Sequence, residues 1–423
     1  MMNETVEYPK FRWVVLLSIG VALLCTGMNT QSFAPLMGDV AKSLGVDLGT
    51  ASLGLMGFGM LAMAILVIPA GHLMDRFGIF RVMLVSIFIQ VITHALLPFA
   101  AKSYETLVIL RIVESIAVAP CFIVTGPVAA IWFPRNEIGI ANGIMVSMLQ
   151  LGTMVGFVAG PMLAETMGSW EIGLALLGII SFVAFVIALV ADVQSKKHQP
   201  PTNVSAGEQE KSSSKTFLRN PLFWFALIAN ALSMWVTMAF ADLMPAYLAV
   251  LPPVGVGMGA ITAGKLMSVV TLSTMIFSLV GGFIIDKVFN GNSRRVILIG
   301  WLVGAISFPA IMFPVVHGNY PVLILFLAFA GLLQAFVGPA LMGFGAKTFS
   351  PTVIGKVIGI WMLSGGIISA VGVSVGSIAL RSTGNYNLSM VIMVGLAIVG
   401  FIITLFLKQR KTDISCKSDI AVC

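Results

Sequence analysis

Long apolar segments alternate with short polar breaks along the whole chain of 423 residues. Each apolar segment is about 18 to 25 residues long, the length at which an α-helix crosses the hydrocarbon core of a bilayer. The pattern therefore predicts an all-α membrane protein with twelve transmembrane helices. These helices are expected to begin near Trp13, Thr50, Val82, Thr106, Gly139, Ile172, Leu222, Ile261, Val296, Pro321, Gly355 and Leu388.

One polar break is much longer than the others and separates two sets of six apolar segments. It contains Lys196, Lys197 and the pair Pro200 and Pro201, a composition typical of a solvated linker. We predict an N-terminal six-helix bundle at 1–193, a cytoplasmic linker at 194–221, a C-terminal six-helix bundle at 222–407 and a cytoplasmic tail at 408–423.

The composition excludes several classes of protein. Apolar residues make up 58% of the chain and charged residues 10%, whereas soluble domains carry roughly a quarter charged residues. This excludes an ordinary water-soluble enzyme, and no Ser-His-Asp set, metal-binding cluster or phosphate-binding loop is visible. We therefore expect no enzymatic activity and no cofactor or metal. The four cysteines, at 25, 121, 416 and 423, show no close pairing and predict neither a disulfide framework nor a zinc site.

The basic residues indicate how the helices are oriented. The chain carries 24 Lys and Arg against 17 Asp and Glu, a net charge of +7. If the N-terminus is cytoplasmic, 19 of these 24 basic residues fall in cytoplasmic segments, and the external loops hold only Lys42, Lys102 and Arg381. Because positive charge is retained on the cytoplasmic side, we predict a multi-pass protein of the cell inner membrane with both termini cytoplasmic. The surplus charge thus reflects topology and not binding to nucleic acid.

Sequence elements recur between the two halves at a nearly constant offset, which is a mark of duplicated transporter halves. Gly71 and Asp75, between the second and third segments, match Gly282 and Asp286 at an offset of 211 residues. The ordered series predicts two equivalent bundles. Two further elements keep almost the same register: Gly126-Pro127 matches Gly338-Pro339 at 212, and Gly156 and Gly160 match Gly372 and Gly376 at 216.

These features resemble the major facilitator superfamily, whose loop signature Gly-x-x-x-Asp-(Arg/Lys)-x-Gly-x-x-(Arg/Lys) follows the second span. The resemblance covers essentially the whole chain and implies two pseudo-symmetric six-helix bundles, a bacterial-type porter for small solutes, and a cytoplasmic gate formed by the signature residues. Alternatively, the signature is only a solvated loop whose charges set the topology. The signature residues are Gly71, Asp75, Arg76, Gly78 and Arg81, with a degenerate second copy at Gly282, Asp286 and Lys287.

Ionisable residues inside apolar spans are costly and are candidates for coupling. Arg111 and Glu114 lie three residues apart, hence on one helical face of the fourth span. Asp242 and Lys265 lie at similar depths in neighbouring spans, where they could form a cross-helix ion pair. The resemblance links Arg111 to coupling with protons or substrate. Alternatively, these charges neutralise one another or only fix helix packing, and His94 is a weaker proton-relay candidate because the third span usually faces lipid in this fold.

Neutral polar residues near mid-membrane are the better candidates for substrate binding, because a transporter binds at its centre and releases on both sides. Each of their amides could instead bond helices together. In the family, spans one, four, seven and ten line the cavity. A mixture of amides with one buried arginine suits a small polar or anionic solute better than a bulky apolar cation. The candidates are Asn29, Gln31, Gln150, Asn230, Trp235 and Gln334.

We therefore predict a secondary active transporter that moves a small polar or anionic solute by alternating access, as a symporter or antiporter coupled to protons or to a counter-solute. We expect it to act as a monomer in the lipid bilayer. A proton-coupled efflux antiporter for drugs or metabolites is the alternative of the same class. The glycines of span five before Pro161 favour it, and Asn29 in place of the acid common in span one disfavours it. A membrane sensor that binds solute without transporting it is the alternative of another class.

Overall fold

The computed structural model describes residues 8–134, 137–195, 197, 215–283, 287–289, 292–350 and 353–407. Within these ranges every regular element is a helix, and twelve helical spans are long and apolar enough to cross a membrane. Taken together with the short helices that continue them, as α3 continues into α4 over Leu48–Phe77, these spans each begin within three residues of the position expected from the pattern of apolar segments. The prediction of an all-α fold with twelve spans is therefore confirmed.

The first six spans are formed by α1 (Arg12–Gln31), α4 (Phe58–Phe77), α5 (Ile79–Ala100), α6 (Tyr104–Ile123), α8 (Ile138–Met167) and α9 (Trp170–Ser195). Three shorter helices extend their ends, α2 (Met37–Leu44), α3 (Leu48–Ser52) and α7 (Thr125–Trp132). The chain reverses sharply between α4 and α5 at Gly78, whose φ of +86° lies in the region that favours glycine.

The last six spans are formed by α10 (Pro221–Ala249), α11 (Ala260–Phe283), α12 (Ser293–Ile311), α14 (Tyr320–Thr348), α15 (Ile354–Thr383) and α16 (Asn387–Leu405). A single turn, α13 (Pro314–His317), lies between α12 and α14. Two of these helices, α10 and α14, begin with a proline in the first turn after an asparagine cap, at Asn220 and Asn319. The asparagine side chain accepts a hydrogen bond from a backbone N–H that has no partner within the helix. The proline has no N–H that would need such a partner.

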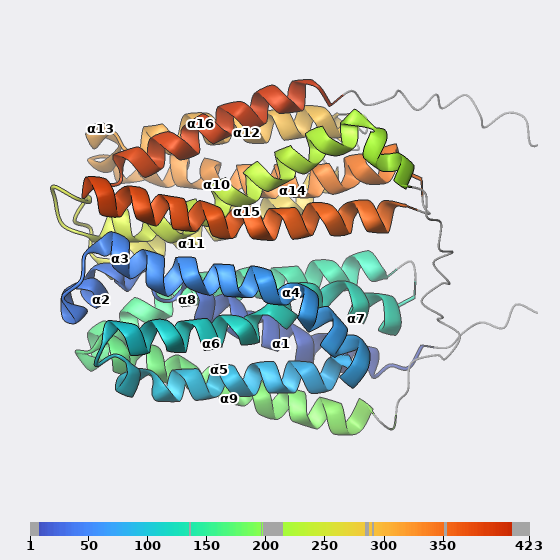
Figure 1. Cartoon of the computed structure of the whole chain (residues 1–423), viewed down its shortest axis with the longest axis horizontal. Coiled ribbons are helices and arrows are strands. Elements are labelled where there is room, and N and C mark those ends of the chain that lie inside the picture. Colours follow the sequence, from blue (N-terminus) through green and yellow to red (C-terminus); the bar gives the residue numbers. More distant parts are fainter. Residues whose placement is uncertain are drawn as a thin grey trace, which may run out of the picture.

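The helices form two groups that lie side by side, α1 to α9 below and α10 to α16 above in Figure 1. Within the groups, α1 packs along α8 and α10 packs along α15, and these two pairs hold equivalent positions in the repeat. The short helices α2, α3 and α13 lie at one end of the molecule, and α7 lies at the other. We call these the α3 end and the α7 end.

Glycines account for the close packing of the two equivalent helix pairs. A Cβ atom on Gly152 or Gly156 of α8 would overlap the backbone carbonyl group of Leu24 or Met28 on α1. The bare face expected on the fifth span is therefore the face that meets α1. On α15, Gly372 leaves room in the same way for the indole ring of Trp235 on α10. Gly156 and Gly372 are a matched pair of the repeat, so both halves use the same packing device.

The two halves approach each other most closely toward the α3 end. Gly49 of α3 packs against the backbone of Arg381 on α15, and Gly264 of α11 packs against the carbonyl oxygen of Phe157 on α8. At the opposite end, α7 packs mainly against α6 and α8 of its own half.

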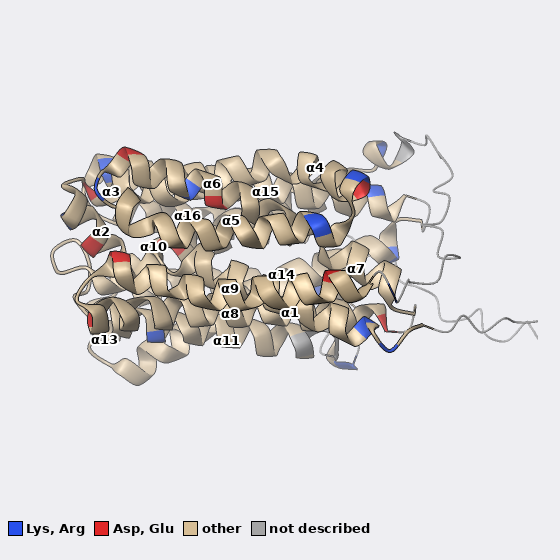
Figure 2. Ribbon diagram, turned by 90° about the horizontal axis from the view of Figure 1, so that it is seen from below, with Lys and Arg blue, Asp and Glu red and all other residues tan. Residues whose placement is uncertain are grey.

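Charged residues gather toward the two ends of the helices, and the middle of the molecule is nearly free of them (Figure 2). This distribution fits helices whose central parts lie in hydrocarbon, where an unpaired charge is costly. The exceptions deep in the helices are therefore the residues to locate with care. Among the described residues these include Arg111, Glu114 and Asp242, all of which are buried.

Candidate functional site

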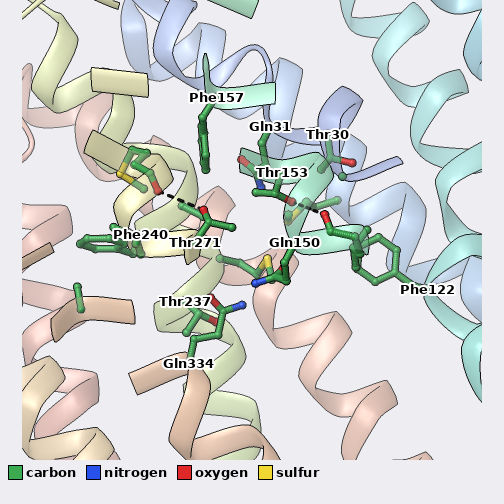
Figure 3. A pocket seen from close by; sticks show the side chains of 18 of the residues that line it. Thr30, Gln31, Phe122, Gln150, Thr153, Phe157, Thr237, Phe240, Thr271 and Gln334 are labelled. Carbon is green, nitrogen blue, oxygen red and sulfur yellow. Dashed lines mark hydrogen bonds between the residues drawn. The ribbon is translucent and has the colours of Figure 1, made fainter. Parts of the chain in front are cut away.

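A cavity lies between the two halves near the middle of the spans. Its wall comes from α1, α4, α6 and α8 on one side and from α10, α11, α12 and α14 on the other. The cavity has a volume of about 90 Å³, room for about three water molecules in the described state. Figure 3 shows that side chains from both halves face this space.

Three of the six predicted binding residues line the cavity. Gln31 on α1, Gln150 on α8 and Gln334 on α14 all contribute to its wall, and they surround it from different sides (Figure 3). No hydrogen bond joins these amide groups to another described residue. The buried oxygen Oε1 of Gln31 has no partner, although this residue is only 6% exposed. The structure thus brings together three amides that the sequence placed near mid-membrane.

The structure places Asn29 away from the cavity. Its amide nitrogen donates to Oε1 of Gln90 at 3.1 Å and to Oγ of Ser181 at 3.1 Å. It therefore ties α1 to α5 and α9 inside the N-terminal half. Because neighbours two apart on a helix point to nearly opposite sides, Asn29 faces the core of this half while Gln31 faces the cavity.

The other two predicted binding residues also pack within one half. The amide nitrogen of Asn230 donates to the carbonyl oxygen of Trp361 at 2.8 Å, so it ties α10 to α15. Trp235 lies against Gly372 in the same helix pair. Both occupy the face of α10 that meets α15, which is why they are turned away from the cavity.

Four threonines line the cavity, and none of them is among the six predicted binding residues. They are Thr30, Thr153, Thr237 and Thr271. Their hydroxyls donate to the backbone carbonyl four residues earlier, at 2.7 to 3.2 Å. Helical spacing carries a signal for one of them, because Thr153 lies three residues after Gln150 and so shares its face. The apolar part of the wall includes Met60, Phe122, Phe157, Met238, Phe240 and Met267.

A buried charged cluster lies beside the cavity in the N-terminal half. Nη1 of Arg111 donates to Oε2 of Glu114 at 2.6 Å, and both residues are 4% exposed. Nε of Arg111 donates to the carbonyl oxygen of Leu55 at 3.3 Å, and the guanidinium stands 4.5 Å from the ring centroid of Phe33. A buried ion pair needs such additional partners to offset its desolvation.

His94 belongs to the same cluster. The expectation that the third span faces lipid at this position is wrong. Its side chain is 2% exposed, and Nδ1 lies 3.0 Å from the carbonyl oxygen of Gln90 and 3.9 Å from Oε1 of Glu114. The other ring nitrogen, Nε2, is buried without a partner. The face of α5 that carries His94 and Gln90 packs inward against α6 and α9, so this part of the third span is interior.

Only one layer of side chains separates this cluster from the central cavity. Arg111 and Glu114 line a smaller side cavity. Thr30, Met60 and Phe122 line both the side cavity and the central one. A change of charge or position at Glu114 therefore acts on groups that also shape the central cavity.

Asp242 does not form the expected ion pair with Lys265. Its Oδ2 accepts a hydrogen bond from Oγ of Ser52 at 2.9 Å, and the same hydroxyl lies 2.7 Å from Oγ of Ser377. Lys265 is exposed, and the described residues contain no ion pair between it and Asp242. Asp242 points from α10 toward the junction of α3 and α15, whereas Lys265 points away from the protein. We call the three-residue arrangement the Ser52–Asp242–Ser377 contact, and it links the two halves near the α3 end.

The residues of the loop signature lie at the α7 end. Asp75, Arg76 and Arg81 are exposed, and no ion pair joins any of them to another described residue. Gly78 supplies the turn described above. A Cβ atom on Gly71 would lie at an ordinary contact distance of 3.7 Å from Cδ1 of Ile123. Of the second copy, Lys287 is exposed, Gly282 lies near the end of α11, and Asp286 lies outside the described residues.

The apolar spans and the two similarly packed halves define a polytopic membrane protein with a cavity between its halves. The model of the Major Facilitator Superfamily matches residues 19–293 and 251–420. The chain belongs to this superfamily. It is therefore a membrane transporter rather than an enzyme, as the loop signature indicated.

Individual relatives differ in what their names say they carry. The probable galactarate/D-glucarate transporter GudP of Bacillus subtilis is 26% identical over 453 aligned positions, which cover 95% of each chain. The nitrate/nitrite transporter NrtP of Nostoc punctiforme is 30% identical, over 52% of this chain and 44% of its own. The cercosporin transporter CTB4 of Cercospora nicotianae is 24% identical over 71% of this chain, which spans 64% of that relative.

Solved structures share the fold. A bacterial homologue of the human lysosomal transporter Spinster, in an inward-facing and unoccupied conformation, superposes with a TM-score of 0.75. The match covers 95% of this chain and 98% of the homologue at 14% sequence identity. The likeness is therefore one of architecture and extends over both six-helix halves.

Proposed function

We propose that the protein is a secondary active transporter that moves a small polar or anionic solute across the membrane by alternating access. One observation carries this proposal: a cavity near mid-membrane is shared by both halves, and the halves pack together over it toward the α3 end, whereas α7 at the other end packs mainly within its own half. A site between two equivalent bundles becomes accessible to one side or the other when the bundles rock.

The proposed orientation puts the α7 end in the cytoplasm and the α3 end outside. It rests on the excess of basic residues in the segments that would face the cytoplasm. In this orientation both termini are cytoplasmic, the host membrane is the cell inner membrane, and the described state is open to the inside. The state named for the Spinster homologue supports the same assignment.

Coupling to protons or to a counter-solute is the second part of the proposal. Arg111, Glu114 and His94 are buried beside the cavity, where a change in the charge of Glu114 would affect its wall. Asp242 is the other buried carboxylate, and it lies where the halves meet. The signature residues around Asp75 would form the cytoplasmic gate when the α7 end closes.

Flux measurements in proteoliposomes test this function. Purified protein is reconstituted with an inward or outward proton gradient, and uptake of radiolabelled galactarate, nitrate and neutral polyols is followed. Accumulation against the solute gradient that an uncoupler abolishes is the expected result for proton coupling. Accumulation that needs a preloaded counter-solute instead indicates exchange. Binding with no flux under any of these conditions would contradict the transport proposal and favour a sensor.

A further inference from the structure

We infer that the central cavity takes an uncharged solute that presents hydrogen-bond donors on one face and an apolar surface on another. The inference rests on the proposed transport function and narrows it, because it selects the uncharged members from the polar or anionic solutes considered above. It rests on three properties of the cavity wall: its charge, the direction of its hydrogen bonds and its apolar surface.

The described lining of the central cavity contains no ionisable side chain. Arg111 is the nearest candidate to balance an anion, but it lies in the side cavity and already pairs with Glu114 at 2.6 Å. Asp242, which could balance a cation, does not line the cavity and lies where the halves meet, hydrogen-bonded to Ser52. A charged solute would therefore lose its hydration without gaining a counter-charge, which is strongly unfavourable.

The threonines make the wall richer in hydrogen-bond acceptors than in donors. A hydroxyl has one proton and two lone pairs. The proton of each cavity threonine is used by a carbonyl of its own helix, for example Thr30 to Thr26 at 2.7 Å and Thr237 to Ser233 at 2.8 Å. Their oxygens thus remain available only to accept. A carboxylate or nitrate, which only accepts, would face repulsion from these oxygens, whereas a hydroxyl or amide N–H would be bound.

Gln31 points most directly to a missing partner. Gln31 is only 6% exposed, and it faces the cavity (Figure 3). Its side-chain oxygen has no hydrogen-bond partner. A buried carbonyl oxygen without a partner is costly, and a donor on the solute removes that cost. Gln150 and Gln334 add amide groups that can donate or accept, so a neutral hydroxyl group is served in either direction.

The remaining wall is apolar and aromatic. Phe157 and Phe240 line the side of the cavity that Thr271 also occupies, and Met60 and Phe122 line the side near Thr30. Such surfaces bind the carbon skeleton of a solute while the amides orient its polar groups. An aromatic or aliphatic molecule with several hydroxyls has both features.

A matched set of glycosides tests the inference. Phenyl β-D-glucoside, phenyl β-D-glucuronide and phenyl 6-amino-6-deoxy-β-D-glucoside differ only in a hydroxymethyl, carboxylate or aminomethyl group at one carbon. Galactitol and galactarate form a second neutral and charged pair. Thermal unfolding of the purified full-length protein is followed with each probe, since a ligand of the folded state raises its unfolding temperature. We expect concentration-dependent stabilisation by phenyl glucoside and galactitol and none by their charged counterparts.

Substitutions connect any stabilisation to the cavity. Gln31→Leu should weaken apparent binding of phenyl glucoside roughly tenfold, because one hydrogen bond to a buried group is lost. Gln194→Leu makes the same chemical change at an exposed position of α9 and should leave binding unchanged. The unfolding temperature without ligand shows whether each variant is folded. Where Gln31→Leu does not fold, Gln150→Leu serves as the second cavity variant.

The outcomes separate this inference from the transport proposal. The inference is overturned if phenyl glucuronide, phenyl 6-amino-6-deoxy-glucoside or galactarate stabilises the protein more than the neutral probes do. It is also overturned if neither neutral probe stabilises the protein, or if substitutions in the cavity leave binding unchanged. Neutral binding that depends on Gln31 but produces no counterflow in proteoliposomes supports the cavity chemistry and contradicts transport. Flux of galactarate with no response to the neutral probes supports transport and contradicts the solute class.

Discussion

The role of a polar side chain in this protein depends on where it falls around its helix. Asn29 and Gln31 are two residues apart on α1, yet the first bonds to α5 and α9 and the second faces the cavity. Both are amides at similar depth in the membrane, so residue type and depth alone do not separate them. The separation comes from the rotation of about 100° per residue together with the packing partners of α1.

A prediction at the residue scale concerns the ion pair beside the cavity. Glu114→Gln removes the negative charge that Nη1 of Arg111 contacts at 2.6 Å. The buried cation is left uncompensated, so the free energy of unfolding should fall by roughly 3 kcal/mol. The freed positive charge should also let the cavity accept an anion, and phenyl glucuronide should then stabilise the variant in thermal unfolding.

The exposed residue Glu105, at the start of the same helix, gives the control for this prediction. Glu105→Gln changes the same group where water screens its charge, and it should alter neither stability nor probe selectivity. If the glucuronide fails to stabilise a folded Glu114→Gln protein, Arg111 does not act on the cavity.

At the scale of elements, the two helix pairs α1 with α8 and α10 with α15 set the shape of each half. Their glycines let the backbones approach until carbonyl groups and side chains of the partner fill the space of the missing Cβ. Such packing is the main force between helices in lipid, because burial of apolar surface gives no gain there. A small change at these positions should therefore be costly.

Two alanine substitutions on α8 test this packing. At Gly152 the added Cβ would overlap the carbonyl group of Leu24, whereas at Gly143 no described atom lies within 4 Å. Gly152→Ala should lower the unfolding temperature in detergent. Gly143→Ala should leave it unchanged or raise it, since alanine favours helix by about 1 kcal/mol over glycine. Equal effects of the two would show that the α1–α8 approach does not limit stability.

The Ser52–Asp242–Ser377 contact is a second device at the scale of elements. It joins α3 in one half to α10 and α15 in the other, so it should favour the state that is closed at the α3 end. Ser377→Ala removes one hydroxyl from this contact and should shift the population toward opening there. Double electron–electron resonance between spin labels at the exposed residues Lys42 and Ser382 should then show a larger share of long distances.

The matched control lies on the same helix. Ser369 is buried on α15, and its hydroxyl donates to the carbonyl oxygen of Gly366 in that helix at 2.8 Å. Ser369→Ala removes a hydroxyl without breaking a link between the halves, and the distance distribution should stay as in the parent. A Ser377→Ala distribution identical to the parent would rule out the contact as a closing device.

For the whole molecule, one set of contacts closes the α3 end, and another has to form when the α7 end closes. We propose that the exposed signature residues at the α7 end make their contacts in that second state. Asp75 is exposed and makes no ion pair with another described residue, as expected for a gate residue in the open position. Its role is therefore visible only through transport and not through the stability of the described state.

Asp75→Asn tests this role. The substitution should leave membrane insertion and thermal stability intact and should lower the initial rate of solute uptake, because the closed state of the α7 end loses a charge contact. Asp39→Asn changes an exposed carboxylate on α2 at the opposite end and should transport at the parent rate. Normal initial uptake by Asp75→Asn would remove the gate assignment.

The apolar pattern alone determined the number, length and order of the spans, because only helices satisfy their backbone hydrogen bonds in hydrocarbon and about 20 residues are needed to cross it. The loop signature and the repeat were enough to assign the superfamily.

The tertiary structure decided which polar residues meet. It joined Gln31, Gln150 and Gln334 around one cavity, moved His94 beside Glu114, and gave Asp242 a serine partner in place of Lys265. These outcomes depend on the rotation of each helix against its neighbours. That rotation is set by close packing between residues distant in the chain, which local periodicity does not contain.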